Sequence, residues 1–170
     1  MPRTTVLLMA LLLVAGCGSE TGTAPPAGAP AASAPADRNV CDMMTIDELK
    51  TAAGLDSAMG ESSESGGADA CTWTGEDGKV VIAQVFSSAD SYEQARQAFQ
   101  TQYGGTAEEV TEVGEKAFYI GGTTGTLQTG TLVAQKGSTP VSVQVMGGTS
   151  DPASRKGEAT AVAHVILGKL

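Results

Sequence analysis

The amino-acid sequence predicts an α+β fold in which one antiparallel sheet of about five strands carries helices on one face. Two observations lead to this class. Signals for the start of a helix occur at three places, and short stretches rich in β-branched residues, separated by turn signals, lie between them. The expected element order is α-β-β-α-β-β-β-α within a single domain, residues 40–170.

The three helices are predicted from their ends. Residues 45–48 (Thr-Ile-Asp-Glu) have the pattern of a capping box, and Gly54 is typical of the position just past a helix end. Residues 90–93 repeat the capping pattern before a helix that ends at Gly104, and residues 151–152 place an aspartate cap before a proline. The apolar residues spaced to form the buried faces of the second and third helices are Tyr92, Ala95, Phe99, Tyr103, Ala159, Val162, Ala163 and Ile166.

Two hairpins are predicted between the helices. Residues 80–86 and 141–146 are rich in β-branched side chains, and the valines of the second stretch alternate with polar residues. Each stretch follows a turn signal that contains glycine, which makes residues 71–74 and 131–135 the first strands of the two hairpins.

A fifth strand and a weak internal repeat complete the predicted order. Residues 116–120 form the strand, and a loop rich in Gly and Thr follows from residue 121 to residue 130. Residues 71–103 align with residues 131–163, so that each segment reads as a hairpin followed by a helix. We therefore expect a possible duplicated hairpin-helix unit.

The amino terminus has the pattern of a secretory signal peptide. Residues 1–16 contain Arg3, then an apolar run from residue 6 to residue 15, and end on small residues. The run is shorter than the roughly 20 residues that a membrane-spanning helix needs. A buried amphipathic helix is the alternative, but residues 6–15 include no polar side chain.

Residues 13–17 (Leu-Val-Ala-Gly-Cys) resemble the bacterial lipobox. The resemblance implies that the Cys17 sulfur takes a diacylglyceryl group, that the chain is cut before Cys17 and, in many bacteria, that the new amine is acylated by a chain such as palmitate. The alternative is an unmodified thiol at Cys17. Cysteine parity argues against it, because three cysteines leave one over after a single disulfide.

The lipid anchor predicts a location on the extracytoplasmic face of the cell membrane, since two or three acyl chains give stable anchoring. Residues 17–39 would join the anchor to the domain as a disordered Ala/Pro/Gly tether, because they lack large apolar side chains. A flexible chain of this length spans roughly 25 Å. The domain would stay near the membrane and rotate freely.

Cys41 and Cys71 are expected to form a disulfide, because the environment outside the cytoplasm is oxidising. Closing a loop of about 30 residues stabilises the fold by roughly 3.5 kcal/mol in the chain-entropy model. Trp73 would lie on the same strand face and cover the sulfurs. A redox-active pair is the alternative, but the Cys-x-x-Cys pattern is missing.

Three short motifs carry a family resemblance. They are residues 41–45 (Cys-Asp-Met-Met-Thr) before a helix, Cys71-x-Trp73 on a strand, and residues 113–118 (Val-Gly-Glu-Lys-Ala-Phe). Together they resemble a group of actinobacterial secreted lipoproteins of uncharacterised function and, more distantly, the extracellular sensor domains of mycobacterial Ser/Thr kinases. The resemblance covers most of residues 41–170 and brings no catalytic residues with it.

Charge excludes some functions and suggests one surface. A net charge of -9 disfavours nucleic acid, which proteins bind through clustered Lys and Arg. Residues 39–78 contain nine acidic side chains against Lys50, which is typical of a solvated, partly disordered loop. The alternative is a cation site or a face for a basic partner. The candidate recognition residues are Glu61, Glu64, Asp69, Glu76 and Asp77.

No catalytic, cofactor or metal site is predicted. One histidine and three cysteines are too few for a zinc site, and the acidic stretch lacks the spacing of an EF-hand loop. His164 lies about 200° around its helix from the buried stripe, so we expect it on the surface. A Gly-x-Ser-x-Gly motif is also missing, which makes a hydrolase the weakest hypothesis.

The sequence therefore favours a lipid-anchored, non-enzymatic binding or sensing module of the cell envelope. The alternative is a carrier of a small apolar or lipidic ligand, with a cavity left between the sheet and the small side chains Ala159 and Ala163. The expected partners are the membrane, through the anchor, and an envelope protein or small ligand. We expect a monomer that does not bind nucleic acid.

Overall fold

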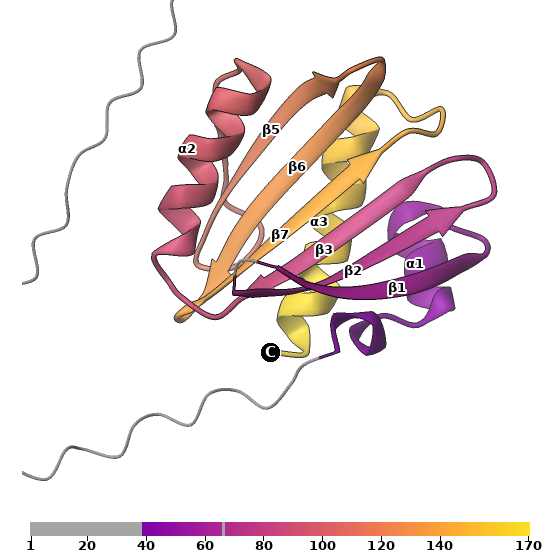
Figure 1. Ribbon diagram of the computed structural model, residues 1–170, viewed down its shortest axis with the longest axis horizontal. Helices are drawn as coiled ribbons and strands as arrows, with labels where there is room; N and C mark the ends of the chain where they lie inside the picture. Colours follow the sequence, from indigo (N-terminus) through magenta and orange to yellow (C-terminus); the bar gives the residue numbers. More distant parts are fainter. Residues whose placement is uncertain (1–38, 66) are drawn as a thin grey trace, which may run out of the picture. The chain divides into compact units, whose positions relative to one another are not determined.

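The computed structural model describes residues 39–65 and 67–170 (Figure 1). The predicted signal peptide, Cys17 and nearly all of the tether lie outside these residues. The described residues belong to one compact unit. Among the described residues, no helix is long and apolar enough to cross a membrane.

The domain contains one seven-stranded sheet in which every neighbouring pair is antiparallel. In spatial order, its strands are β1 (Ala58–Ser65), β2 (Ala68–Gly75), β3 (Val80–Phe86), β7 (Thr139–Met146), β6 (Leu127–Lys136), β5 (Lys116–Thr124) and β4 (Glu108–Val110). The helices are the short 3-10 helix η1 (Val40–Met43), α1 (Ile46–Ala53), α2 (Ser91–Tyr103) and α3 (Pro152–Gly168). The α+β class with one antiparallel sheet is confirmed, but the sheet has two more strands than the expected five.

The two additional strands are the edge strands, and both lack the local pattern of a strand. β4 has three residues, and β1 has the sequence Ala-Met-Gly-Glu-Ser-Ser-Glu-Ser, without a β-branched side chain. No strand is predicted from the sequence before residue 71. β1 is a strand because its backbone pairs with β2 along its whole length, from Ala58 opposite Gly75 to Ser65 opposite Ala68.

The predicted Gly/Thr-rich loop, residues 121–130, is wrong. β5 and β6 continue through most of it, and Gly121 pairs with Gly130. The glycines are needed for close packing: a Cβ on Gly122 would lie 2.5 Å from the Tyr103 ring, and one on Gly130 would lie 2.5 Å from the Tyr119 hydroxyl. The turn itself is short, around Gly125.

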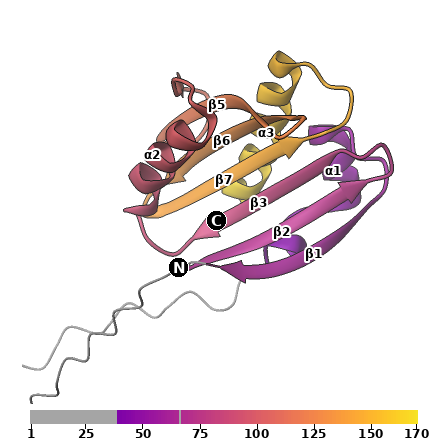
Figure 2. The same cartoon turned by 45° about the horizontal axis from the view of Figure 1, so that its top comes forward.

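The expectation that the helices share one face of the sheet is also wrong. η1, α1 and α3 pack on one face, whereas α2 packs on the other (Figures 1 and 2). Neighbouring residues of β6 show this division, because Leu132 belongs to the core under α3 and Val133 to the core under α2. The amphipathic pattern of α2 required a sheet face but carried no information about which one.

The two faces form two separate cores. The larger lies under α1 and α3 and includes Trp73, Val143 and Leu132. The smaller lies under α2, where Tyr92 meets Phe118 edge-on with ring centroids 5.4 Å apart. On this second face α2 packs over β5 and β6, and the half made by β1, β2, β3 and β7 is open in Figure 1.

The repeated hairpin-then-helix order is present, as β2-β3-α2 and β6-β7-α3. The two hairpins differ in register by one residue: Cys71 pairs with Ala83, whereas Thr131 pairs with Gln144 rather than Val143. A one-residue slip moves every side chain of a strand to the opposite face. The two helices also cover opposite faces, so the repeat is one of element order only.

The helix ends largely confirm the predicted caps. Thr45 and Glu48 form the reciprocal capping box of α1, and Asp151 accepts hydrogen bonds from the first backbone N–H groups of α3. Gly54 ends α1 in the left-handed conformation. The prediction was wrong for Asp90, whose side chain makes no capping hydrogen bond to α2.

Candidate recognition surface

The disulfide between Cys41 and Cys71 is present and joins η1 to the middle of β2, with 5.0 Å between the Cα atoms. Cys71 and Trp73 are buried on the same face of the strand. Gly60 of β1 lies directly over them, since a Cβ there would be 3.0 to 3.2 Å from the Trp73 indole nitrogen and both sulfurs. This enclosure gives the disulfide a structural role.

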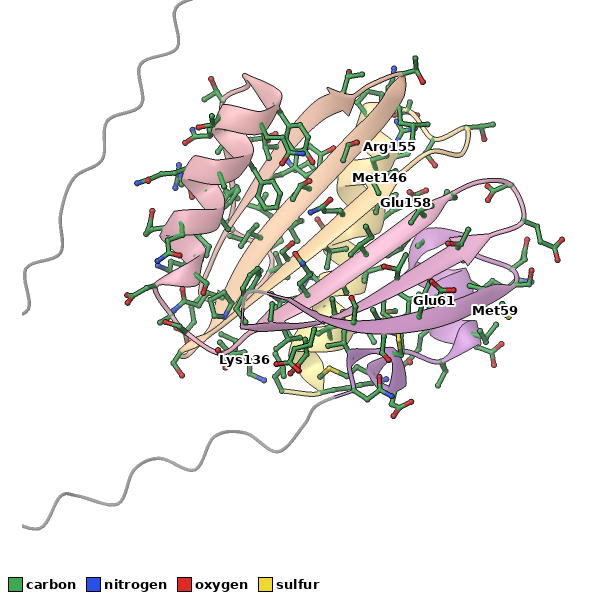
Figure 3. All side chains as sticks on the ribbon, in the orientation of Figure 1. Met59, Glu61, Lys136, Met146, Arg155 and Glu158 are labelled. Carbon is green, nitrogen blue, oxygen red and sulfur yellow. A yellow bond between two sulfur atoms is a disulfide. The ribbon has the colours of Figure 1, made fainter. Side chains whose placement is uncertain are left out.

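The five acidic residues predicted as a recognition surface lie at three separate places. Glu64 and Asp69 are register partners on β1 and β2. Glu76 and Asp77 occupy the turn between β2 and β3, and the Asp77 carboxylate accepts a hydrogen bond from the Lys79 backbone at 3.0 Å. Glu61 lies alone on β1, near Met59 in Figure 3. Only Glu64 and Asp69 are brought together by strand pairing.

A buried polar network fastens the start of α3 to neighbouring segments of the chain, and no local pattern in the sequence indicates it. Lys79 donates to the Glu158 carboxylate at 2.9 Å and to the Ala53 carbonyl at 2.8 Å. Arg155, one helical turn before Glu158 (Figure 3), donates to the Gly147 carbonyl and the Gln128 side chain, each at 3.0 Å. Lys79 and Glu158 form an ion pair, and the buried Arg155 guanidinium donates to neutral oxygens, so the network holds α3 in place rather than supplying a free acid or base.

Tyr119 holds the same region from the sheet side. Its hydroxyl donates to the Pro152 carbonyl in the first turn of α3 at 3.2 Å. Burial raises the pKa of this hydroxyl, so it stays protonated and remains a donor. Together with the network, it fixes the position of α3 relative to β5.

The outer face of α3, the side turned away from the sheet, carries no Asp, Glu, Lys or Arg after its second turn. It consists of Gly157, Thr160, Ala161, His164, Val165 and Gly168, none of which is fully buried. A surface helix normally shows charged side chains to water. The outer face is therefore the unusual surface of this domain.

Two grooves run along this outer face. The α3–β4 groove, about 530 Å³, lies between α3 and residues 109–112 and includes Gly157, Ala161 and His164. The α1–α3 groove, about 360 Å³, lies on the other side of Ala161 and includes Ala52 and Val165. Ala161 belongs to both, so the two grooves meet on α3.

Carboxylates line the rims of both grooves. Glu109 and Glu112 border the α3–β4 groove together with one cation, Lys156, which pairs with Glu108. Asp47 and Glu48 border the α1–α3 groove. Arg96 pairs with Glu109, and Lys169 pairs with Glu48 at 2.8 Å. Among the described residues, Glu112 and Asp47 have no ion-pair partner within 4.0 Å. The rims thus keep an excess of negative charge.

The sequence contains a signal for this surface beyond the buried stripe of the helix. After Glu158 the helix has no Asp, Glu, Lys or Arg up to Lys169, and Gly157 lies in its interior. His164 is exposed as expected, but it lies at the α3–β4 groove rather than on an isolated surface.

The packing leaves no room for the cavity expected beside Ala159 and Ala163. Both residues, and Leu132 and Val143 in the same core, have no accessible surface. A side chain without accessible surface leaves no room for even a water molecule beside it. The small side chains bring α3 close to the sheet instead.

The described part of the chain contains no group of three or more His, Cys, Asp or Glu side chains placed to hold a metal ion. Comparisons of the chain with protein-family models, with curated proteins and with solved structures found no match.

Proposed function

We propose that the chain is an extracytoplasmic binding module, held to the cell membrane by lipidated Cys17, that recognises its partner through the α3–β4 groove. The lipobox-like residues 13–17 support the anchor. The tether predicted for residues 17–39 would let the domain turn this groove toward a neighbour in the envelope.

The observation that carries the binding role is the uncharged outer face of α3. Contiguous uncharged surface with a charged rim is typical of sites where proteins bind one another. Here the floor of the α3–β4 groove includes Gly157 and Ala161, and the charged side chains at its rim are Glu109, Glu112 and Lys156. The five acidic residues of the original hypothesis do not form such a surface, because they are divided among three places.

The carrier function has no comparable support. It depended on a cavity between α3 and the sheet, and Ala159 and Ala163 are packed without accessible surface there. We therefore place the binding surface on the outside of α3 rather than beneath it.

Two experiments test the proposal in the native host. Cell fractionation should find the wild type in the membrane and the Cys17→Ala variant in the medium. Native electrophoresis of detergent-solubilised membranes should show the wild type in a complex larger than the monomer, and Ala161→Arg should migrate as the monomer, because its guanidinium would occupy the groove.

Thr72→Arg is the matched control, since Thr72 lies on the open half of the sheet. It should leave the complex intact. Retention of Cys17→Ala in the membrane contradicts the anchor, and an Ala161→Arg variant that migrates like the wild type contradicts the binding surface.

A further inference from the structure

We infer that the α3–β4 groove accepts an α-helix of a partner protein, with Lys or Arg side chains beside a stripe of small or apolar residues. This inference rests on the proposed binding function and adds the chemistry of the partner. Four features of the groove support it.

The first feature is Gly157, which the fold itself does not require. Glycine is among the poorest helix formers, yet Gly157 lies inside the 17-residue helix α3. A Cβ at this position would meet nothing within 4 Å, and the backbone φ is not positive. Gly122 and Gly130 differ, because neighbouring side chains fill the space that a Cβ would need there. Neither packing nor backbone conformation within the domain requires glycine at position 157. A glycine there is suited to a surface that the backbone of another chain approaches closely.

The second feature is the spacing of small residues along the helix. Ala153, Gly157 and Ala161 are four residues apart, and all three line the α3–β4 groove. Positions four apart form one row along a helix, and a second helix packs its side chains against such rows. A row of small residues allows the two helix axes to come close together.

The third feature is the geometry beside α3. The residues that border the groove opposite α3 come from β4 and the two residues after it, Thr111 and Glu112. The floor of the groove is therefore bounded by the last strand of the sheet. A helix beside α3 would extend the layer that α1 and α3 begin. An added strand would gain less, because β4 offers an edge of only three residues.

The fourth feature is charge. Glu109, Glu112 and Lys156 line the groove. Glu109 pairs with Arg96 and Lys156 pairs with Glu108, which leaves the Glu112 carboxylate as the lining charge without an ion-pair partner among the described residues. Residues 39–170 carry 17 acidic and eight basic side chains. A second copy of this acidic domain would therefore be repelled, whereas a basic helix would be attracted.

The test uses the full chain in the membranes of its host, with the photoreactive amino acid benzoylphenylalanine in place of Thr160, which lines the groove. Irradiation should join it to a partner segment, and mass spectrometry should identify that segment as one that contains Lys or Arg. A synthetic peptide of the segment should become helical, by circular dichroism, when it binds the purified protein. The same photoreactive residue at Thr74, exposed on β2, is the positional control and should give no such product.

Substitutions at Gly157 separate binding from folding. Gly157→Ala should raise the melting temperature by about 3 °C, because alanine is the better helix former. It should nevertheless lower the cross-linked yield at least threefold, and Gly157→Leu should lower it at least tenfold. Glu112→Lys should lower the yield at least threefold without a change in melting temperature.

The outcomes distinguish the inference from the proposed function. A complete lack of cross-linking at Thr160 contradicts both. Cross-linking to a segment that is acidic or remains non-helical contradicts the inference alone. An undiminished yield with Gly157→Ala and Gly157→Leu also overturns it, because the glycine would then have no part in the contact.

Discussion

The two faces of the sheet differ in how completely they are covered. Under α1 and α3, Leu132, Val143 and Ile166 have no accessible surface and belong to one continuous core. On the opposite face α2 covers only a small core, and its Phe99 and Tyr103 remain partly exposed. The first face thus accounts for most of the apolar burial that stabilises the domain.

The solvent-facing surfaces on the two sides of the sheet also differ. The open half of the second face presents Thr72, Ile82 and Gln144 to water, which is ordinary for an antiparallel sheet with one solvated side. The outer face of α3 is less ordinary, because a helix whose inner side is fully packed has uncharged residues on its outer side as well. The comparison leads to predictions about stability on each face.

The largest effect is expected from the main core. Leu132→Ala should lower the free energy of unfolding by about 4 kcal/mol, because it removes buried methyl groups and leaves a cavity. Phe99→Ala should lower it by roughly half as much, because Phe99 is already partly exposed. Urea unfolding measures both values, and equal losses would mean that the two faces stabilise the domain equally.

The disulfide is expected to come next. Replacing both Cys41 and Cys71 with serine should reduce the free energy of unfolding by about 3 kcal/mol, as expected for a loop of 30 residues. Hydrogen exchange should accelerate most in η1 and β1, which the disulfide and β2 hold in place. If exchange rises as much in α2 as in β1, the disulfide stabilises the whole domain rather than this side of it.

The ion pair on the covered face should have a somewhat smaller effect. Lys79→Met should reduce the free energy of unfolding by about 2 kcal/mol, because the Glu158 carboxylate loses its cation while keeping 17% of its side chain exposed. Adding Glu158→Leu to this variant should restore most of the lost free energy of unfolding, because it removes the unpaired carboxylate. If the double variant is as unstable as Lys79→Met, the stability is lost with the ion pair itself and not through the unpaired Glu158 charge.

The smallest effect concerns pH and the helix caps. Hydrogen bonding to Lys169 lowers the pKa of Glu48, and the backbone N–H of Ser154 lowers the pKa of Asp151, each below its ordinary value of 4.5 or 3.8. Carboxylates with a lowered pKa stabilise the folded state above their ordinary pKa and lose this effect as the pH falls through the lowered value. Amide exchange at the starts of α1 and α3 should therefore accelerate modestly below about pH 4. The start of α2, where Asp90 makes no capping bond, serves as the internal control and should show no comparable change.

The candidate surface was only partly accessible to prediction. The uncharged run after Glu158 and the unusual Gly157 are visible in the sequence. Their significance depends on residues 109–112, which lie more than 40 positions earlier and form the opposite side of the groove. The concentration of acidic residues between 39 and 78 was visible too, but strand pairing places these side chains on different faces and ends of one hairpin.

The sequence by itself determined the features that depend on near neighbours along the chain. These are the caps at Thr45 and Asp151, the alternating strand that contains Val143, and the buried stripe of α3, because each involves contacts within about four residues. Only the tertiary structure decided that β1 is a strand, that the two hairpins differ by one residue in register, and that α2 packs opposite α3. Those features depend on which distant backbones pair and which face each helix reaches, and the free energy of such pairing comes from contacts that no local pattern contains.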